Sequence, residues 1–136
     1  MVTALSATAS LRLYWAARIC MAFLWLWTAL SSWFFFPHEQ SLAWLLRLGI
    51  ESHTEACFEA ACALDLAMGV ATLCFASRRL WLVQMALVVF YSVAIIFGLP
   101  ELLFQPFGPL SKNAAVLVCL AMLAAMEGGA APKQNN

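Results

Sequence analysis

Four apolar stretches, each ended by charged or helix-breaking residues, constrain this chain more than any other feature. A helix needs about 20 apolar residues to cross the hydrocarbon core of a membrane. The stretches cover residues 13–36, 54–76, 80–99 and 113–126. Only 10% of the residues are charged and 65% are hydrophobic, whereas soluble domains have about 25% charged residues. The sequence therefore predicts an all-α, integral membrane, antiparallel four-helix bundle.

The fourth stretch is the weakest of the four, because about 14 residues are short for a span. Either residues 104–110 add a piece that dips into the membrane, or the helix continues past Glu127. Gly128 and Gly129 argue against the second alternative. The expected membrane domain covers residues 1–127, and residues 128–136 are expected to form a polar, disordered tail.

The basic residues predict the orientation of the chain. An even number of spans places both termini on one side, and cytoplasmic loops carry an excess of Lys and Arg. The side of the termini would hold Arg12, Arg18, Arg78, Arg79 and Lys133. The other side would hold only Arg47 and Lys112. Both termini are therefore expected in the cytoplasm. The net charge is zero, which gives no reason to expect nucleic acid as a partner.

Asp65 lies near the middle of the second stretch, about 16 Å from either end of its helix. A carboxylate at that depth costs several kcal/mol unless it is paired or protonated, so it indicates a buried polar interior. One interpretation is an ion pair with Arg18 that fixes the helix register. The alternative is a carboxylate that handles protons or binds a ligand.

Helical spacing predicts which faces look inward. Two seven-residue repeats mark polar and aromatic stripes: Arg18, Trp25 and Ser32 in the first span, and Gln84, Tyr91 and Gly98 in the third. Small residues form another stripe in the second span, of the kind that lets helices approach closely in lipid: Ala56, Ala60, Ala63, Ala67 and Ala71.

A second polar group gathers on the side opposite the termini. Its members are His38, Glu39, Glu51, His53, Glu55 and Glu59. The spacing matches no metal signature, so solvated loop charges are the preferred interpretation and no metal site is predicted. None of the five cysteines forms a C-x-x-C pair, so no disulfide framework is expected.

The connection before the fourth span reads PELLFQPFGPLSKN, and its prolines argue against a regular helix there. Lys112 and Asn113 stand at the start of the span. Lys112 has three alternatives: it reaches lipid headgroups, it pairs with Glu101, Glu55 or Glu59, or it holds an anionic or quinone ligand.

Four fragments together resemble the DoxX-like family of small bacterial membrane proteins. They are Arg18 in the first span, FFFPH over residues 34–38, ALDLAMG over residues 63–69 and LPELLFQPFGPLSKN over residues 99–113. The resemblance covers about residues 12–127. It implies a four-helix bundle in the cytoplasmic (inner) membrane of a bacterium and a link to redox biology, because relatives are subunits of thiosulfate–quinone oxidoreductases.

Three functions remain open at this point. The first is an accessory or anchoring subunit of a redox or energy-converting membrane complex, held by lipids and by other subunits or further copies of itself. The second is a quinone-linked oxidoreductase component, in which Arg18, Trp25, Asp65, Tyr91 and Lys112 line a pocket between helices. The third is a small lipid-, pigment- or solute-binding membrane protein. No catalytic residue is predicted, and quinone is the one cofactor that this reasoning suggests.

Overall fold

The computed structural model describes residues 6–105 and 108–129, and every regular element within them is helical. In chain order the elements are α1 (Ala7–Leu30), a π-helical turn η1 (Ser31–Phe35), α2 (His38–Arg47), α3 (Thr54–Cys74), α4 (Arg78–Gly98), a 3-10 turn η2 (Pro100–Phe104) and α5 (Pro109–Gly129). The helices α1 with η1, α3, α4 and α5 are long and apolar enough to cross a membrane. The all-α class and the four predicted spans are thus confirmed. Residues 130–136 of the expected tail, including Lys133, lie outside the described residues.

The helix ends follow from local chemistry. The Ser6 and Ser77 side chains cap α1 and α4 by accepting hydrogen bonds of 3.2 Å from the backbone three residues later. The fourth span differs from the prediction, since α5 has 21 residues instead of about 14. Pro109 fits the first turn, where a backbone N–H has no helical partner, and the helix ends at Gly129. The alternative in which the helix continues past Glu127 is thus confirmed, and Gly128 and Gly129, which were expected in the polar tail, belong to α5. The helical start at Pro109 was not predicted.

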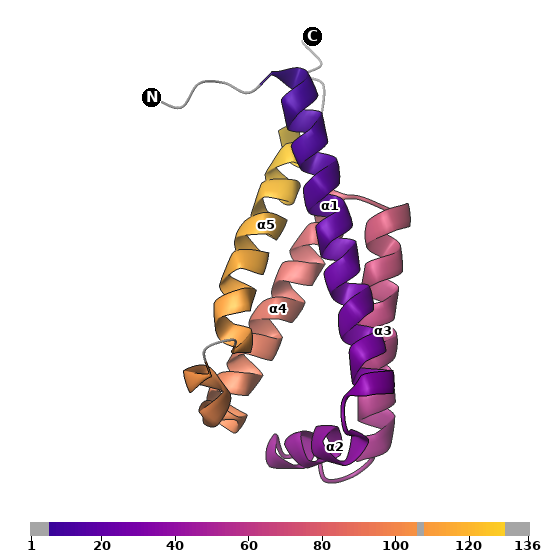
Figure 1. Ribbon diagram of the computed structural model, residues 1–136, viewed down its shortest axis with the longest axis vertical. Coiled ribbons are helices and arrows are strands. Elements are labelled where there is room, and N and C mark those ends of the chain that lie inside the picture. The colour runs from indigo at the N-terminus through magenta and orange to yellow at the C-terminus, as the bar shows by residue number, and fades with distance from the viewer. Residues whose placement is uncertain (1–5, 106–107, 130–136) are drawn as a thin grey trace.

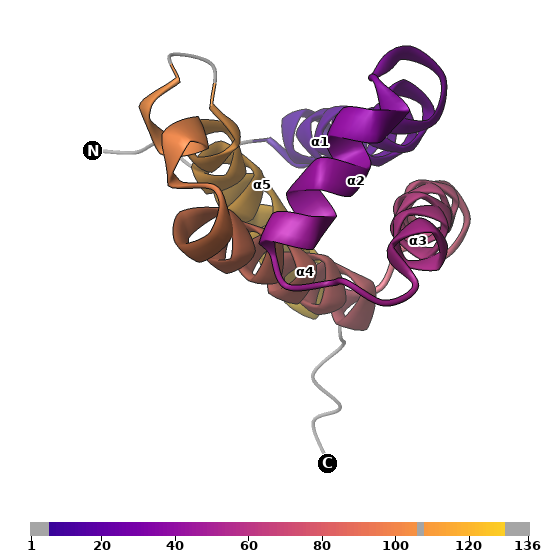
Figure 2. The same cartoon turned by 90° about the horizontal axis from the view of Figure 1, so that it is seen from below.

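The spans form two antiparallel pairs (Figures 1 and 2). One pair is α1 with α3, the other is α4 with α5, and α1 also contacts α5. The close approach of α1 and α3 depends on Gly69, where a Cβ atom would lie 2.6 Å from Cγ and 3.1 Å from the backbone nitrogen of Leu26. A larger side chain at Gly69 would therefore push the two helices apart.

The helix α2 was not predicted, because its polar start at His38 and Glu39 was interpreted as a loop. It lies across one end of the spans instead of continuing α1 (Figure 2). Pro37 breaks the helical path after the π turn, and the chain leaves α2 through Gly49 and His53, both with positive φ (87° and 63°).

The core is concentrated away from α2, in the half where α1 begins and α5 ends. It contains Met21, Trp25, Trp81, Val88, Val116, Leu120, Leu123 and Ala124. The buried face of α3 differs from the predicted one. Phe58, Cys62, Asp65, Gly69 and Thr72 are buried, whereas four of the five stripe alanines are exposed. Ala56, Ala60, Ala63 and Ala67 thus lie on the outer surface of the molecule, outside the buried face that packs on α1.

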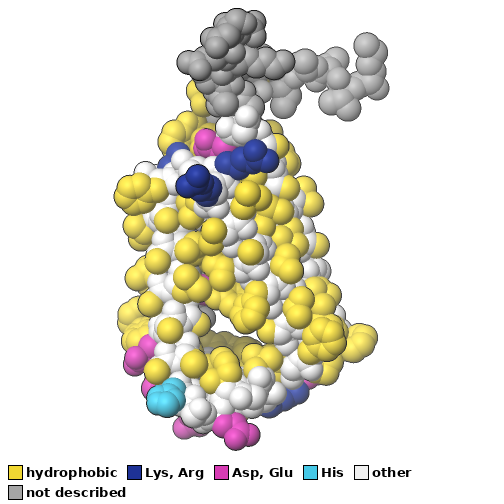
Figure 3. Space-filling view, turned by 180° about the vertical axis from the view of Figure 1, so that it is seen from behind, with side chains coloured by type: hydrophobic (Ala, Val, Ile, Leu, Met, Phe, Trp, Pro, Cys, Tyr) yellow, Lys and Arg dark blue, Asp and Glu magenta, His cyan; other side chains and the backbone are white. Residues whose placement is uncertain are grey.

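Charged side chains separate along the spans (Figure 3). The end where α3 meets α4 carries most of the arginines, and the end covered by α2 carries most of the carboxylates and the histidines. On the same face the surface is hollowed next to α2, which shows that packing is looser in that half.

Candidate functional site

Two adjoining cavities lie beneath α2, and both are lined by Leu45, Leu48 and Ala61. The first, which we call the Asp65 cavity, has a volume of about 430 Å³. It is lined by Ser31, Ser32, Phe35, Phe36, Ser41, Trp44, Leu45, Leu48, Phe58, Ala61, Cys62, Asp65 and Leu99. Three hydroxyls and one carboxylate therefore face a space whose other walls are mainly apolar and aromatic.

The second, which we call the lateral cavity, has a volume of about 840 Å³ and lies between α3 and α4. Leu64 of α3 and Phe90, Ala94 and Phe97 of α4 are among its lining residues. Because α3 packs along α1 and α4 packs along α5, a gap remains between α3 and α4, and Figure 3 shows the surface hollowed there. The lateral cavity thus opens on the face that the hydrocarbon of a membrane would surround.

Asp65 and Tyr91 meet where the two cavities adjoin. The Tyr91 hydroxyl donates a 3.3 Å hydrogen bond to Asp65 Oδ1. Asp65 is only 7% exposed and lines the Asp65 cavity, whereas Tyr91 lines the lateral cavity. A carboxylate has about four acceptor positions. Among the described residues, Asp65 accepts a side-chain hydrogen bond from Tyr91 alone. Its remaining capacity is available to water, to a proton or to a ligand in the cavity.

The predicted ion pair between Arg18 and Asp65 is wrong. Arg18 donates from Nε to the Thr72 carbonyl at 2.7 Å and from Nη2 to the Leu73 carbonyl at 2.6 Å. Antiparallel packing places Arg18 beside the last turn of α3, about two turns away from Asp65. The guanidinium is therefore satisfied by carbonyls at the negative end of the α3 dipole, and its carbon lies 4.7 Å from the centre of the Trp15 ring.

Trp25 and Gln84 belong to a buried structural network and lie outside the cavity linings. Trp25 Nε1 donates to Gln84 Oε1 at 2.9 Å, and Gln84 Nε2 donates to the Thr72 hydroxyl at 2.7 Å. Thr72 in turn donates to the Met68 carbonyl at 2.7 Å. This chain of bonds joins α1, α4 and α3 in the tightly packed half of the molecule.

Two polar contacts hold α2 over the cavities. His38 Nε2 at its start lies 2.8 Å from the Glu55 carboxylate of α3, and Arg47 at its end forms an ion pair with Glu101 of η2 through both terminal guanidinium nitrogens. The hydrogen bond from Arg47 lowers the pKa of the Glu101 carboxyl, and the same contact raises the pKa of Arg47. Both contacts are exposed to water, so each contributes little to stability.

The other residues predicted on this side are dispersed. Asn113 donates a 2.9 Å hydrogen bond to the Ser92 hydroxyl and so joins α5 to α4. Lys112 is exposed, and among the described residues Glu55 and Glu101 are engaged by His38 and Arg47 instead. The predicted pairing of Lys112 with Glu55 or Glu101 is thus wrong. Glu59 lines a separate groove on the outer surface.

The residues of α2 that cover the cavities were not predicted from the sequence, because the segment was interpreted as a loop. A signal was present: Ser41, Leu45 and Leu48 follow one another at three- and four-residue spacing, which places them on one helical face. Within the described ranges, 6–105 and 108–129, no group of three or more His, Cys, Asp or Glu side chains converges as metal ligands would.

The sequence profile of the DoxX-like family matches residues 22–121, about three quarters of the chain. The chain belongs to the DoxX-like family. The matched region of this DoxX-like protein includes Asp65, Tyr91 and all the residues that line the two cavities, while Arg18 lies before it. Comparisons with curated proteins and with solved structures give no match.

Proposed function

We propose that this DoxX-like protein binds a lipid-soluble ligand of the quinone kind in the two cavities beneath α2. The observation that carries the proposal is the Asp65–Tyr91 pair, which lies where a partly polar cavity adjoins one that opens between α3 and α4. Ligand sites typically combine apolar walls with a few convergent polar groups, as these cavities do.

The ligand would enter from the membrane through the lateral cavity. A carbonyl or hydroxyl headgroup would exchange hydrogen bonds with Tyr91, Asp65 and the cavity serines, while Phe35 and Trp44 enclose its ring. An apolar tail would remain in the gap lined by Phe90 and Phe97. Any electron transfer would need a redox group supplied by a partner.

The two tyrosines of the chain provide a matched test. Tyr91→Phe removes the hydroxyl at the cavity junction, whereas Tyr14→Phe removes one that donates to Glu127 at the opposite end of the molecule. Because one hydrogen bond to the ligand is lost, Tyr91→Phe should bind a short-chain quinone about two- to tenfold more weakly. Tyr14→Phe should bind it with the affinity of the unmodified protein.

The measurement uses the full chain in lipid nanodiscs, with quinone affinity followed by quenching of tryptophan fluorescence. Mass spectrometry of lipids extracted with the protein would identify any ligand that copurifies. Equal affinities for both variants, together with an extract that contains no quinone or other isoprenoid, would refute the proposal.

We also propose an accessory role in a larger membrane complex, such as a redox or energy-converting assembly. The support is the exposed alanine stripe of α3, a surface of the kind that packs closely against another membrane helix. The test is purification in mild detergent after crosslinking. A monodisperse protein that crosslinks neither to another subunit nor to itself would contradict this role.

For the membrane arrangement, we infer an antiparallel four-helix bundle in the bacterial cytoplasmic membrane, with the ends of α1 and α5 facing the cytoplasm. Arg12, Arg18, Arg78 and Arg79 lie toward that end, whereas Arg47 and Lys112 lie at the other. Accessibility tags at residues 50 and 78 test the orientation, and labelling of the tag at residue 78 from outside the cell would overturn it.

A further inference from the structure

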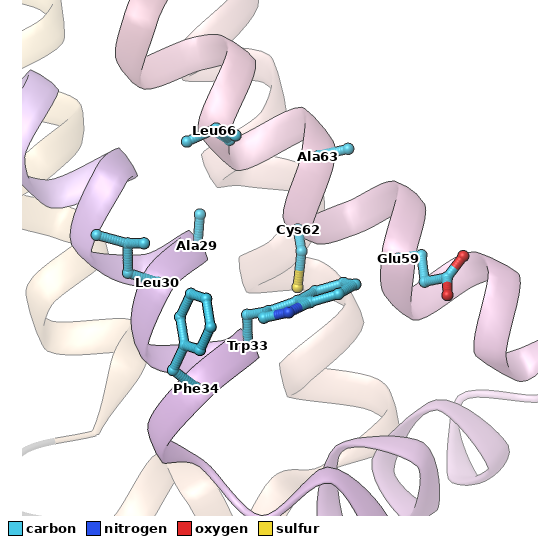
Figure 4. A pocket seen from close by; sticks show the side chains of 8 residues that line it. All are labelled: Ala29, Leu30, Trp33, Phe34, Glu59, Cys62, Ala63 and Leu66. Atoms are coloured by element: carbon cyan, nitrogen blue, oxygen red, sulfur yellow. The ribbon is translucent and has the colours of Figure 1, made fainter.

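A groove of about 500 Å³ runs along the outer surface between α1 and α3, separate from the cavities beneath α2 except for the shared wall residue Cys62. We call it the α1–α3 groove. Its lining residues, shown in Figure 4, are Ala29, Leu30, Trp33, Phe34, Glu59, Cys62, Ala63 and Leu66. Seven of the eight are apolar, so the surface that faces the membrane here is hollow and almost uniformly apolar.

The groove has a defined direction relative to the membrane. Trp33 and Phe34 belong to the π turn at the α2 end of α1, and Trp33 stacks on Phe58 with ring centres 6.0 Å apart. Leu30 and Leu66 lie farther along their helices, toward the middle of the spans. An occupant would therefore place its polar end beside the aromatic residues and its apolar part toward the bilayer centre.

Glu59 is the one charged residue of the groove. It lies five residues after Thr54, about 7.5 Å below the start of α3, and its side chain is exposed. Figure 4 shows it on the same side of α3 as the groove, beyond Cys62 and Ala63. Among the described residues none forms an ion pair with Glu59, and Glu55, one turn away, is engaged by His38.

An exposed carboxylate at this depth is unfavourable in contact with acyl chains. It either reaches up toward water or attracts a cation to the membrane boundary. An anionic lipid headgroup would be repelled by Glu59, whereas an ammonium group would neutralise it. The charge at one end of the groove and its apolar floor thus favour a molecule that carries an ammonium group in its headgroup and has acyl chains.

We propose that the α1–α3 groove binds a phospholipid with a primary ammonium headgroup, of the ethanolamine class. The ammonium group pairs with the Glu59 carboxylate, and the Trp33 ring lies at the level of the glycerol esters. One acyl chain follows Ala63 and Leu66 toward the bilayer centre, in the space that the small side chains Ala29 and Ala63 leave free.

The experiment uses the full chain in nanodiscs that contain equal amounts of phosphatidylethanolamine and phosphatidylglycerol with identical acyl chains. Native mass spectrometry after gentle release of bulk lipid measures the ratio of the two lipids retained. The ratio should favour phosphatidylethanolamine by about two- to fivefold, the range expected for a partly exposed ion pair. Glu59→Gln should reduce it to about one.

Two further variants separate the groove from general effects of charge and folding. Glu51→Gln removes an exposed carboxylate from the loop on the same side of the molecule and should leave the ratio unchanged. Ala63→Leu fills the groove at an exposed position and should lower the retention of both lipids. Equal retention in the unmodified chain, a preference that survives Glu59→Gln, or a second copy of the chain crosslinked across the groove in place of lipid would each overturn the proposal.

Discussion

The hydrogen bond between Trp25 and Gln84 permits a quantitative test of the buried network. Gln84 is fully buried, and its side chain receives the Trp25 indole N–H at 2.9 Å while donating to Thr72 at 2.7 Å. Replacing Gln84 with Leu conserves its approximate size but leaves the indole N–H without an acceptor. Thr72 keeps its own bond to the Met68 carbonyl, so the orphaned indole is the main cost.

An unsatisfied buried donor costs about 1 to 3 kcal/mol, and hydrogen bonds between membrane helices contribute about 0.6 kcal/mol on average, up to about 1.7. We therefore expect Gln84→Leu to lower the free energy of unfolding by about 1 to 3 kcal/mol. Trp25→Phe leaves Gln84 Oε1 unpaired and should also destabilise. Once one partner is absent, removing the other costs less, so the double variant should be less destabilised than the sum of the singles by about 0.6 to 1.7 kcal/mol.

The assay is unfolding in mixed micelles by titration with sodium dodecyl sulfate, followed by circular dichroism because tryptophan is one of the residues changed. Gln40→Leu and Trp27→Phe are matched controls, since both side chains are exposed. They should change the free energy of unfolding by less than about 0.5 kcal/mol. If the effects of Trp25→Phe and Gln84→Leu add within about 0.3 kcal/mol, the bond makes no net contribution and the reasoning fails.

Two further predictions concern charged groups. Arg18→Met leaves the last carbonyls of α3 without their donor and should lower the free energy of unfolding by about 1 to 3 kcal/mol in the same titration. The control Arg12→Met, at an exposed position, should have little effect. Equal stability of the two variants would contradict the role of Arg18. The pKa of Glu101 is lowered by Arg47, so the pair is fully formed above the ordinary carboxyl pKa of about 4.3 and is lost as the pH falls through the lowered value. A spin label on α2 should therefore gain mobility upon acidification below about pH 4.3, and the persistence of that pH dependence in Glu101→Gln would count against the pair as its cause.

The four membrane spans were predictable because they depend on a local property, the length of apolar sequence between charges and prolines. The buried position of Asp65 was predictable for a related reason, since an ionisable group far from either interface must find shelter among other helices. The first of the predicted repeats also placed Arg18 and Trp25 correctly on the buried face of α1. These inferences need only the periodicity of a helix and the cost of moving charge into hydrocarbon.

The partners of those groups depended on the offset between helices, which sequence periodicity does not contain. Because α1 and α3 are offset by about two turns, Arg18 donates to carbonyls at the end of α3, and Asp65 accepts its hydrogen bond from Tyr91. Tertiary packing also decided which face of α3 contacts α1. Gly69 allows Leu26 of α1 to approach closely, whereas the alanine stripe faces outward.

The site itself arises from three-dimensional packing. The cavities exist because α3 and α4, adjacent in sequence, pack on different neighbours and because α2 crosses the gap that this leaves. Composition and spacing could establish that the chain is a membrane protein with buried polar groups. The cavity beside Asp65 requires contacts between residues distant in sequence, and their energies are decided only when all the helices are in place.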